Sequence, residues 1–280
     1  MPPRQRVLRH ATVTSSERVS PQLIRLTFDS PDLIGLDLPF TDHYVKLLFP
    51  PQDAPYSHPV DPEQAATQYP EHRLVTRTYS LRYRDTVNGT MVLDFVTHGD
   101  TGLAGPWAQR ANPGDAISYF GPGGAWAPSA DYDHFVLVGD EAASPAICAA
   151  LDEFPEGATG VAFLEVAEQS AVFDIPEPAG VQIVWVFRDG APFGQRLAQA
   201  VRASQIAEGR TGWFVHGVAE MVKDLRRYLF VERGVSKSDA SISGYWRTGM
   251  TEDGWQSSKH EFVAGMEAEE AAALVIPDPS

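Results

Sequence analysis

The sequence predicts an N-terminal antiparallel β-barrel over residues 1–130, followed by an α/β domain with a parallel sheet over residues 131–280. Three observations carry this prediction. The first half holds roughly six short alternating segments separated by turn residues, as in small barrels. From residue 133, strand-like and helix-like segments alternate. The near-continuous apolar runs at 161–166 and 181–187 are typical of parallel strands covered on both faces.

Strands of the barrel are expected at residues 7–14, 23–28, 43–49, 74–84, 91–98 and 115–120. Asn88-Gly89 is a strong hairpin signal between the fourth and fifth. Residues 50–70 contain six prolines and few apolar side chains, which predicts a long surface loop. Residues 99–105 are rich in glycine and lead into a short helix, and a Gly-Pro-Gly-Gly run at 121–124 ends the region.

Strands of the second domain are expected at residues 134–139, 161–166, 181–187, 213–216 and 241–246, with helices at 143–154, 193–203 and 219–232. The last helix is amphipathic, and Gly234 closes it. Ligands of such sheets bind outside the carboxyl ends of the strands, where Gly139-Asp140-Glu141 and His216-Gly217 lie. The last 30 residues hold seven acidic residues against Lys259 alone and are expected to form an acidic tail.

The acidity of the chain limits its partners. Its 37 acidic and 22 basic residues give a net charge of −15, which disfavours nucleic acid and anionic membranes. The sequence contains no long apolar run for a transmembrane helix and no apolar stretch of a signal peptide. The single Cys148 cannot form an internal disulfide and is expected to be a buried thiol. We therefore expect a cytoplasmic monomer without stable membrane association.

The strand at 74–84 carries the most informative chemistry. Residues two apart share a face of a strand, so Arg77 and Tyr79 point one way, and Thr78 and Ser80 point the other. A cation suits a phosphate and a phenol ring suits a flat heterocycle, a combination that fits a flavin nucleotide. The alternative is an exposed strand with solvated charges. His98 has no partner at metal-ligand spacing, so no metal site is expected.

Seven short motifs follow one another along the chain, at residues 77–82, 94–104, 107–108, 113–115, 121–124, 139–141 and 244–247. In composition and order they resemble those of siderophore-interacting proteins, which are flavin-dependent ferric-siderophore reductases with a ferredoxin-reductase arrangement. The resemblance spans roughly residues 5 to 250. It implies FAD in the barrel, NADH or NADPH as the electron donor, and transfer of electrons through FAD to Fe(III) in a siderophore, which releases Fe(II) for iron assimilation.

The resemblance also implies roles for single residues. Arg77 would pair with an FAD phosphate, Tyr79 would pack on the isoalloxazine or ribityl part, and Ser80 would lie near flavin N5. For Trp107 and Trp246, packing in the core is the alternative to a contact with the cofactor. No acid–base residue or nucleophile is needed for the electron step. The other predicted cofactor-binding residues are Thr78, Asp94, Val96, Thr97, His98, Gly102, Ala104, Trp107, Gly139, Asp140, Glu141 and Trp246.

A ferric siderophore with catecholate arms is anionic and would need a basic cleft beside the flavin. Lys46, Arg82 and Arg247 are the predicted substrate-binding residues. Lys46 could instead extend its ammonium group to water. Arg247 could instead form a structural ion pair.

The sequence departs from the family pattern where the donor would bind. Family members commonly follow Gly-Asp-Glu with Thr-Ala-Leu-Pro-Ala, whereas residues 142–146 are Ala-Ala-Ser-Pro-Ala, with Ser144 as a replacement hydroxyl. The usual Gly-Glu-Ala is Gly-Val-Ala at 217–219. NADH, NADPH and reduced ferredoxin therefore remain alternative donors. Arg188 fits either a 2′-phosphate or an ordinary strand-end charge. Two other functions stay open, a flavin oxidoreductase with another small acceptor and a siderophore carrier without turnover.

Overall fold

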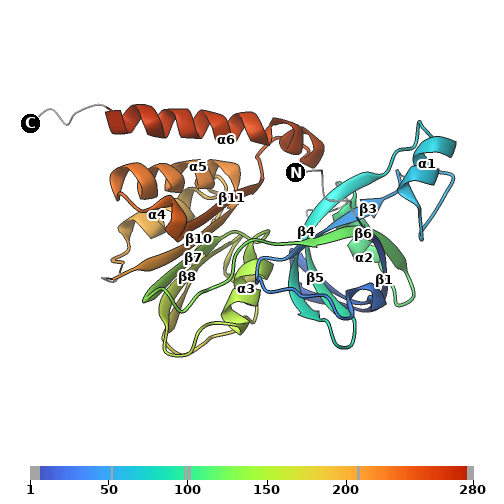
Figure 1. Ribbon diagram of the computed structural model, residues 1–280, viewed down its shortest axis with the longest axis horizontal. Coiled ribbons are helices and arrows are strands. Elements are labelled where there is room, and N and C mark those ends of the chain that lie inside the picture. The colour runs from blue at the N-terminus through green and yellow to red at the C-terminus, as the bar shows by residue number, and fades with distance from the viewer. Residues whose placement is uncertain (1–6, 52, 98, 100–101, 207–208, 276–280) are drawn as a thin grey trace, which may run out of the picture. The chain divides into compact units, whose positions relative to one another are not determined.

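Six antiparallel strands of the computed structural model close into a barrel in the order β1-β2-β5-β4-β3-β6, and five parallel strands form a second sheet (Figure 1). The structure describes residues 7–51, 53–97, 99, 102–206 and 209–275. The chain divides into a unit ending at Ala127, to which Cys148–Ala150 are assigned, and a unit of residues 128–147 and 151–280. The predicted fold class is confirmed.

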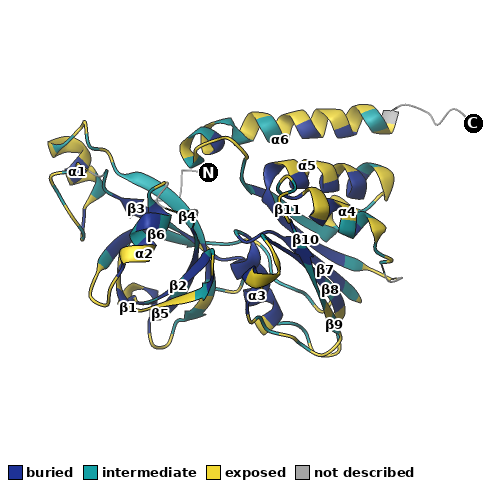
Figure 2. Ribbon diagram, turned by 180° about the vertical axis from the view of Figure 1, so that it is seen from behind, coloured by how far each residue is buried: buried dark blue, intermediate teal, exposed yellow. Residues whose placement is uncertain are grey.

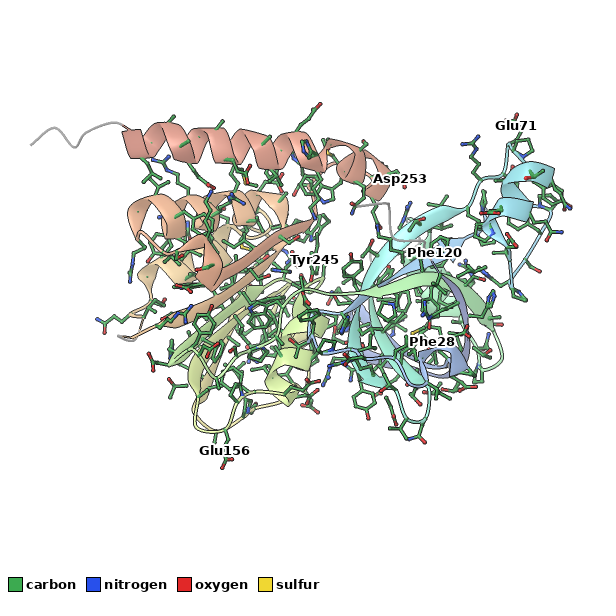
Figure 3. The ribbon with its side chains drawn as sticks, in the orientation of Figure 1. Phe28, Glu71, Phe120, Glu156, Tyr245 and Asp253 are labelled. Carbon is green, nitrogen blue, oxygen red and sulfur yellow. The ribbon has the colours of Figure 1, made fainter. Side chains whose placement is uncertain are left out.

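Inward-facing apolar side chains hold the barrel together. Val45 and Leu47 of β3 and Leu93 and Phe95 of β5 are fully buried, and each alternates with a residue on the outer face. Figure 3 shows Phe28, also fully buried, within the barrel. The barrel strands are β1 (Leu8–Ser20), β2 (Leu23–Asp29), β3 (Tyr44–Phe49), β4 (Val75–Asp85), β5 (Thr90–Val96) and β6 (Ala116–Gly123), joined by short helices at Pro31–Leu33 (η1), Pro62–Gln68 (α1) and Ala104–Arg110 (α2).

The surface loop predicted at 50–70 contains a helix, α1, which was not expected. Pro62 occupies the start of the helix, where a missing backbone N–H removes no hydrogen bond. Asp61 caps this helix by accepting hydrogen bonds from the N–H groups of Glu63 and Gln64. The proline content therefore marked the beginning of a helix as well as the turns around it.

Two barrel strands run further than predicted. β1 continues to Ser20, and β6 continues through the Gly-Pro-Gly run. Glycine is required there because a Cβ at Gly123 would lie 2.8 Å from the Tyr44 ring, and one at Gly124 would lie 2.6 Å from Nδ1 of His43. The glycines thus let β6 pass close to two aromatic side chains.

The second unit is a sheet in the order β11-β10-β7-β8-β9 with helices on both faces. Figure 1 shows α4 and α5 on one face, α6 outside α5, and α3 on the other face. Figure 2 shows the strands largely buried, whereas α6 has a buried and an exposed side. The elements are β7 (His134–Gly139), α3 (Ser144–Asp152), β8 (Thr159–Val166), η2 (Gln169–Ala171), β9 (Val181–Phe187), α4 (Gln195–Ala203), β10 (Thr211–Val218), α5 (Ala219–Arg227), a π-helical turn (Tyr228–Glu232), η4 (Lys237–Asp239), β11 (Ala240–Trp246) and α6 (Glu252–Val275).

Within the acidic C-terminal stretch, Glu252–Val275 form a helix, α6, where a tail was expected. Trp255 is 1% exposed and packs so closely on β11 that a Cβ at Gly244 would lie 2.9 Å from its ring. Glu270 is 5% exposed. It forms an ion pair with Arg226 and another, at 3.1 Å, with Lys237. Some of the acidic residues therefore attach the helix to the unit instead of repelling it. No helix in the part of the chain described here is long and apolar enough to cross a bilayer.

The buried His216 predicts how stability depends on pH. Its ring accepts or donates hydrogen bonds with Tyr245 and Ser241 hydroxyls at 3.1 and 2.9 Å. Burial, with a smaller contribution from Lys259, lowers its pKa from 6.5 to about 3. Between these values the unfolded chain binds a proton that the folded chain does not. The free energy of unfolding should therefore fall as the pH drops below 6.5, by up to about 1.4 kcal/mol per pH unit.

Urea unfolding at several pH values checks this expectation. His216→Gln should flatten the slope between pH 6 and 4, roughly as the loss of one titrating group requires. His260→Gln, at an exposed position on α6, is the control and should keep the wild-type slope. An unchanged slope in His216→Gln would contradict the buried neutral state.

Candidate functional site

The predicted residues 77–80 lie on β4, and its pairing with β3 fixes their faces. Arg77 is opposite Leu47, and Tyr79 is opposite Val45. Both β3 residues belong to the barrel core, so Arg77 and Tyr79 lie on the inner face of the strand. Arg77 is half-buried, and its Nη1 donates to the Thr76 carbonyl at 2.8 Å.

The outer face of the same strand carries the two hydroxyls. Thr78 is opposite Lys46, and Ser80 is opposite Tyr44. Ser80 is only 7% exposed, whereas Lys46 is half-buried. Among the described residues, Lys46 makes no ion pair with a carboxylate. Its ammonium group is therefore available to an anion at the outer face of β3.

Tyr79 and Trp107 belong to one aromatic cluster at the barrel interior. The Tyr79 ring lies 4.4 Å from that of Phe95, and Phe95 lies 5.9 Å from Trp107. Trp107 also contacts Phe49 and Phe28, at 5.6 and 6.5 Å between ring centroids. These contacts attach α2 to the barrel, so the packing alternative for Trp107 has direct geometric support.

Two glycines in the segment before α2 leave its backbone uncovered by side chains. Gly99 and Gly102 have φ angles of 64° and 87°, and, apart from chain neighbours, no atom of the described residues lies within 4 Å of where their Cβ atoms would be. Ala104, the first residue of α2, is buried. Gly105 lets the helix pass β5, because its Cβ would be 3.3 Å from the carbonyl of Val96. His98, also predicted here, lies outside the described residues.

Asp94 and Thr97 are occupied within the barrel wall. Both oxygens of Asp94 accept hydrogen bonds from Arg25, at 2.7 and 2.8 Å, across the β2–β5 ladder. The Asp94 side chain is 1% exposed. Thr97 is buried, and its N–H donates to the Gln22 carbonyl at 2.7 Å. Asp94 therefore serves the wall in this structure, and Arg25 is a partner that sequence reasoning did not find.

Arg82 stands at an irregularity of β4. The pairing with β5 shifts between Leu81 and Tyr83, so Arg82 is the additional residue of a bulge. Beyond the bulge, Arg84 donates twice to the Leu38 carbonyl, at 3.3 and 3.0 Å. The alternation of side chains between the two faces of β4 is therefore interrupted at Arg82. A strand pattern with a period of two did not predict this interruption.

In the α/β unit, Asp140 connects the ends of three strands. Its Oδ1 accepts from the N–H groups of Ala142 and Ala143, at 3.0 and 3.2 Å. Its Oδ2 accepts from the Val218 N–H and from Nε1 of Trp246, both at 2.8 Å. Burial, with the neighbouring Glu141, raises the pKa of Asp140 to about 7, against the opposing effect of the Trp246 and Val218 bonds.

Gly139 permits the turn that begins at Asp140. A Cβ there would lie 2.6 Å from that of Ala143 and 2.8 Å from Ile147. Ser144, the predicted replacement hydroxyl, takes part in the same turn by donating to the Glu141 carbonyl at 2.9 Å. Ser144 thus completes a local hydrogen bond at the start of α3.

A buried charge cluster lies at the carboxyl ends of β7, β8 and β9. Arg188 donates to Glu141 at 3.1 and 3.2 Å and to Glu165 at 3.1 Å. Glu165 also accepts from the Gly194 N–H at 3.0 Å, and Arg188 lies 4.1 Å above the Phe193 ring. Arg188 is 9% exposed, so it is not an ordinary strand-end charge. Sequence reasoning missed Glu165 because a carboxylate inside an apolar strand gives no local signal of its partner.

Trp246 and Arg247 are both held by neighbours in the α/β unit. The Trp246 ring meets Phe193 edge-on at 4.8 Å, in addition to its bond with Asp140. Arg247 lies 3.5 Å from Glu220 and 4.9 Å above the ring of Phe262 on α6. The ion-pair alternative for Arg247 is therefore formed in this structure.

Family models match both units of the chain. The model for the siderophore-interacting FAD-binding domain matches residues 12–126. The model for siderophore-interacting protein matches residues 132–249. The two matches cover most of the barrel and most of the α/β unit.

Curated relatives and solved structures agree with these models. Ferric vibriobactin reductase ViuB of Vibrio cholerae is 31% identical over 244 residues, which are 86% of this chain and 90% of ViuB. The NADPH-dependent ferric-chelate reductase of Escherichia coli is 28% identical, over 85% of this chain and 92% of its own. The crystal structure of a siderophore utilization protein from T. fusca has a TM-score of 0.77 at 31% identity and covers 88% of this chain and 95% of its own.

A more distant structure concerns the fold alone. The ferredoxin reductase in carbazole 1,9a-dioxygenase has a TM-score of 0.63 at 14% identity, over 88% of this chain and 71% of its own. The barrel, the parallel sheet and the matches to both family models lead to one assignment. The chain belongs to the siderophore-interacting protein family and has the ferredoxin-reductase-like fold.

Proposed function

We propose that this protein reduces Fe(III) held in a siderophore, with electrons that NADH or NADPH delivers through FAD bound at the barrel. The observation that carries the proposal is the arrangement on β3 and β4. Lys46 on β3 is half-buried and has no carboxylate partner among the described residues. It is opposite Thr78 on β4, the strand that carries the predicted flavin residues. ViuB and the E. coli relative, by their names, reduce ferric vibriobactin and ferric chelates.

The barrel residues fit FAD in chemistry. Arg77 supplies a cation for a phosphate, Tyr79 a ring for a flat heterocycle, and Thr78 and Ser80 supply hydroxyls. The open space at Gly99 and Gly102 leaves room for a ligand to approach backbone N–H groups before α2. Val96, Thr97 and Ala104 would line the same path, and Trp107 would hold α2 in place.

The reaction needs only positioning and electrostatics from the protein. Bound FAD would supply the link between a two-electron donor and a one-electron acceptor, so one hydride would suffice for two ferric complexes. Siderophores hold Fe(III) through hard oxygen ligands, and Fe(II) is the poorer match, so reduction loosens the iron. Ser80 would donate or accept a hydrogen bond at the flavin. Lys46 would hold the anionic substrate.

The predicted substrate-binding side chains differ in whether they already have partners. Lys46 has no described ion-pair partner, whereas Arg247 already pairs with Glu220 and stacks on Phe262. We propose Lys46 as the principal siderophore contact, with Arg82 and Arg247 contributing. Action as a monomer in the cytoplasm stays a prediction of the sequence.

An anaerobic assay tests the function. The protein reconstituted with FAD should be yellow, should be bleached by NADH or NADPH, and should then form a coloured complex with an Fe(II) chelator when a ferric siderophore is added. Reduced ferredoxin serves as a third donor. Siderophore binding without an Fe(II) complex from any donor would establish the carrier reading and end the reductase proposal.

Lys46→Ala should weaken binding of a ferric tris-catecholate siderophore about tenfold, because one cation facing an anionic complex is lost. Tryptophan-fluorescence titration measures this. Lys46→Arg restores the charge and should recover most of the affinity, and Lys223→Ala, a lysine on the exposed face of α5, is the matched control. The flavin absorbance should stay unchanged. Equal affinity in Lys46→Ala and the wild type would remove Lys46 from the site.

Asp94→Asn separates a wall residue from a cofactor ligand. Loss of the buried carboxylate leaves Arg25 without its partner, so the free energy of unfolding should fall by about 2–3 kcal/mol. FAD affinity, measured by fluorescence on titration, should remain within about threefold of the wild type. Asp29→Asn, on the exposed end of β2, is the control for stability. Loss of FAD at unchanged stability would instead make Asp94 a cofactor ligand.

A further inference from the structure

The strand order of the α/β unit defines where a nucleotide phosphate should bind. β7 comes first in the sequence, β8 and β9 lie to one side of it, and β10 and β11 lie to the other. The order therefore reverses between β7 and β10. In open parallel sheets, ligands bind at this reversal outside the carboxyl ends of the strands. A dinucleotide pyrophosphate there accepts hydrogen bonds from backbone N–H groups at the start of the first helix.

The carboxylate of Asp140 already occupies that position. Ala142 and Ala143, directly before α3, donate their N–H groups to it at 3.0 and 3.2 Å. Across the reversal, the Val218 N–H donates at 2.8 Å. Asp140 is 1% exposed. These donors are the groups that a ligand phosphate would otherwise use.

The backbone on the other side of the reversal is shaped around this carboxylate. Gly217 has a φ of 138°, and a Cβ there would lie 2.9 Å from the carboxyl carbon of Asp140. Any other residue at 217 would therefore push the carboxylate away from Val218. A ligand phosphate, which is larger than a carboxylate, would require Asp140 to leave.

The neighbouring charges oppose a second phosphate as well. The guanidinium group of Arg188, which follows β9, forms ion pairs with Glu141 and Glu165. Glu168 follows β8 with an exposed carboxylate. In dinucleotide-binding sheets of this kind, a nearby arginine accommodates a 2′-phosphate. Here carboxylates surround the guanidinium, so a 2′-phosphate would meet more negative than positive charge.

We propose that Asp140 replaces the ligand phosphate at the switch point of this sheet, so that the α/β unit holds neither the pyrophosphate nor the 2′-phosphate of the donor. NADH and NADPH are then used without discrimination, because neither the pyrophosphate nor a 2′-phosphate contributes affinity. This inference rests on the proposed reductase function for its kinetic consequence only. The occupancy of the phosphate position is a property of the chain itself.

Nucleotide binding by the wild-type FAD-loaded protein is the first test. Calorimetric titration with ADP-ribose and with 2′-phospho-ADP-ribose should give no binding heat up to millimolar concentration. In stopped-flow flavin reduction, NADH, NADPH and reduced nicotinamide mononucleotide should react within about threefold of one another at equal concentration. Binding of either ADP-ribose, or a reduction rate for the mononucleotide at least about tenfold below that of NADH, would overturn the proposal.

Asp140→Ala is the second test, because it frees the backbone donors. The variant should gain binding of inorganic pyrophosphate, measured by calorimetry, that the wild type lacks. Asp133→Ala is the matched control: it removes a carboxylate that accepts a backbone N–H from Arg210 at 2.9 Å at the opposite edge of the sheet, and it should gain nothing. A folded Asp140→Ala variant that binds no pyrophosphate would count against the proposal. If that variant does not fold, the wild-type titration decides. The calorimetry is independent of iron reduction, so failure of the reductase assay leaves this test intact.

Discussion

The register between β3 and β4 is the constraint on which the barrel's chemistry depends. A strand has a side-chain period of two, so a slip of one residue would exchange every inner and outer side chain. In the observed register, Lys46 is opposite Thr78, and both share the outer face with Ser80. A slip would place the Lys46 ammonium group in the apolar interior. The core residues Val45 and Leu47 therefore also determine which face carries the cation and the hydroxyls.

The α/β unit depends on a different kind of constraint, which is the satisfaction of buried charge. Glu165 lies in a strand that is covered on both faces, and a buried carboxylate without partners is strongly destabilising. Arg188 and the Gly194 N–H supply those partners. Asp140 is satisfied by four N–H donors from four separate residues. Both carboxylates thereby fix the geometry of the strand ends at which a ligand would be expected.

Much of this architecture follows from the sequence because the relevant signals are local. The alternation in β4 and the apolar runs in β8 and β9 predicted the strands, and the face assignment of Arg77 and Tyr79 is confirmed by the pairing with β3. The bulge at Arg82 left no such signal, because it appears only in the pairing with β5. The ion pair of Arg25 with Asp94 joins residues 69 positions apart, and a local pattern does not report contacts of that kind.

Helix α6 was missed although its signal was present. Trp255, Phe262 and Met266 are spaced by seven and four residues, which places them on one face of a helix. The prediction instead followed the surplus of acidic residues. Charge composition describes how a segment interacts with solvent, whereas the spacing of a few apolar residues decides whether it can pack. In a segment with few apolar residues, the second property is the more informative.

The motifs of the family contain two classes of polar residue, and their charge separates them. FAD, a nucleotide donor and a catecholate siderophore all carry negative charge, so a carboxylate facing their charged groups would be repelled. Asp94, Asp140 and Glu141 were all predicted to bind cofactor, yet each directs its carboxylate to a guanidinium or an N–H group of the chain. The cation Lys46 has no such described partner. Acidic residues of these motifs thus shape the fold, and cations, hydroxyls and glycine backbone stay the predicted ligand contacts. The resemblance alone does not make this distinction, because a shared motif records that a residue is kept and not which neighbour it serves.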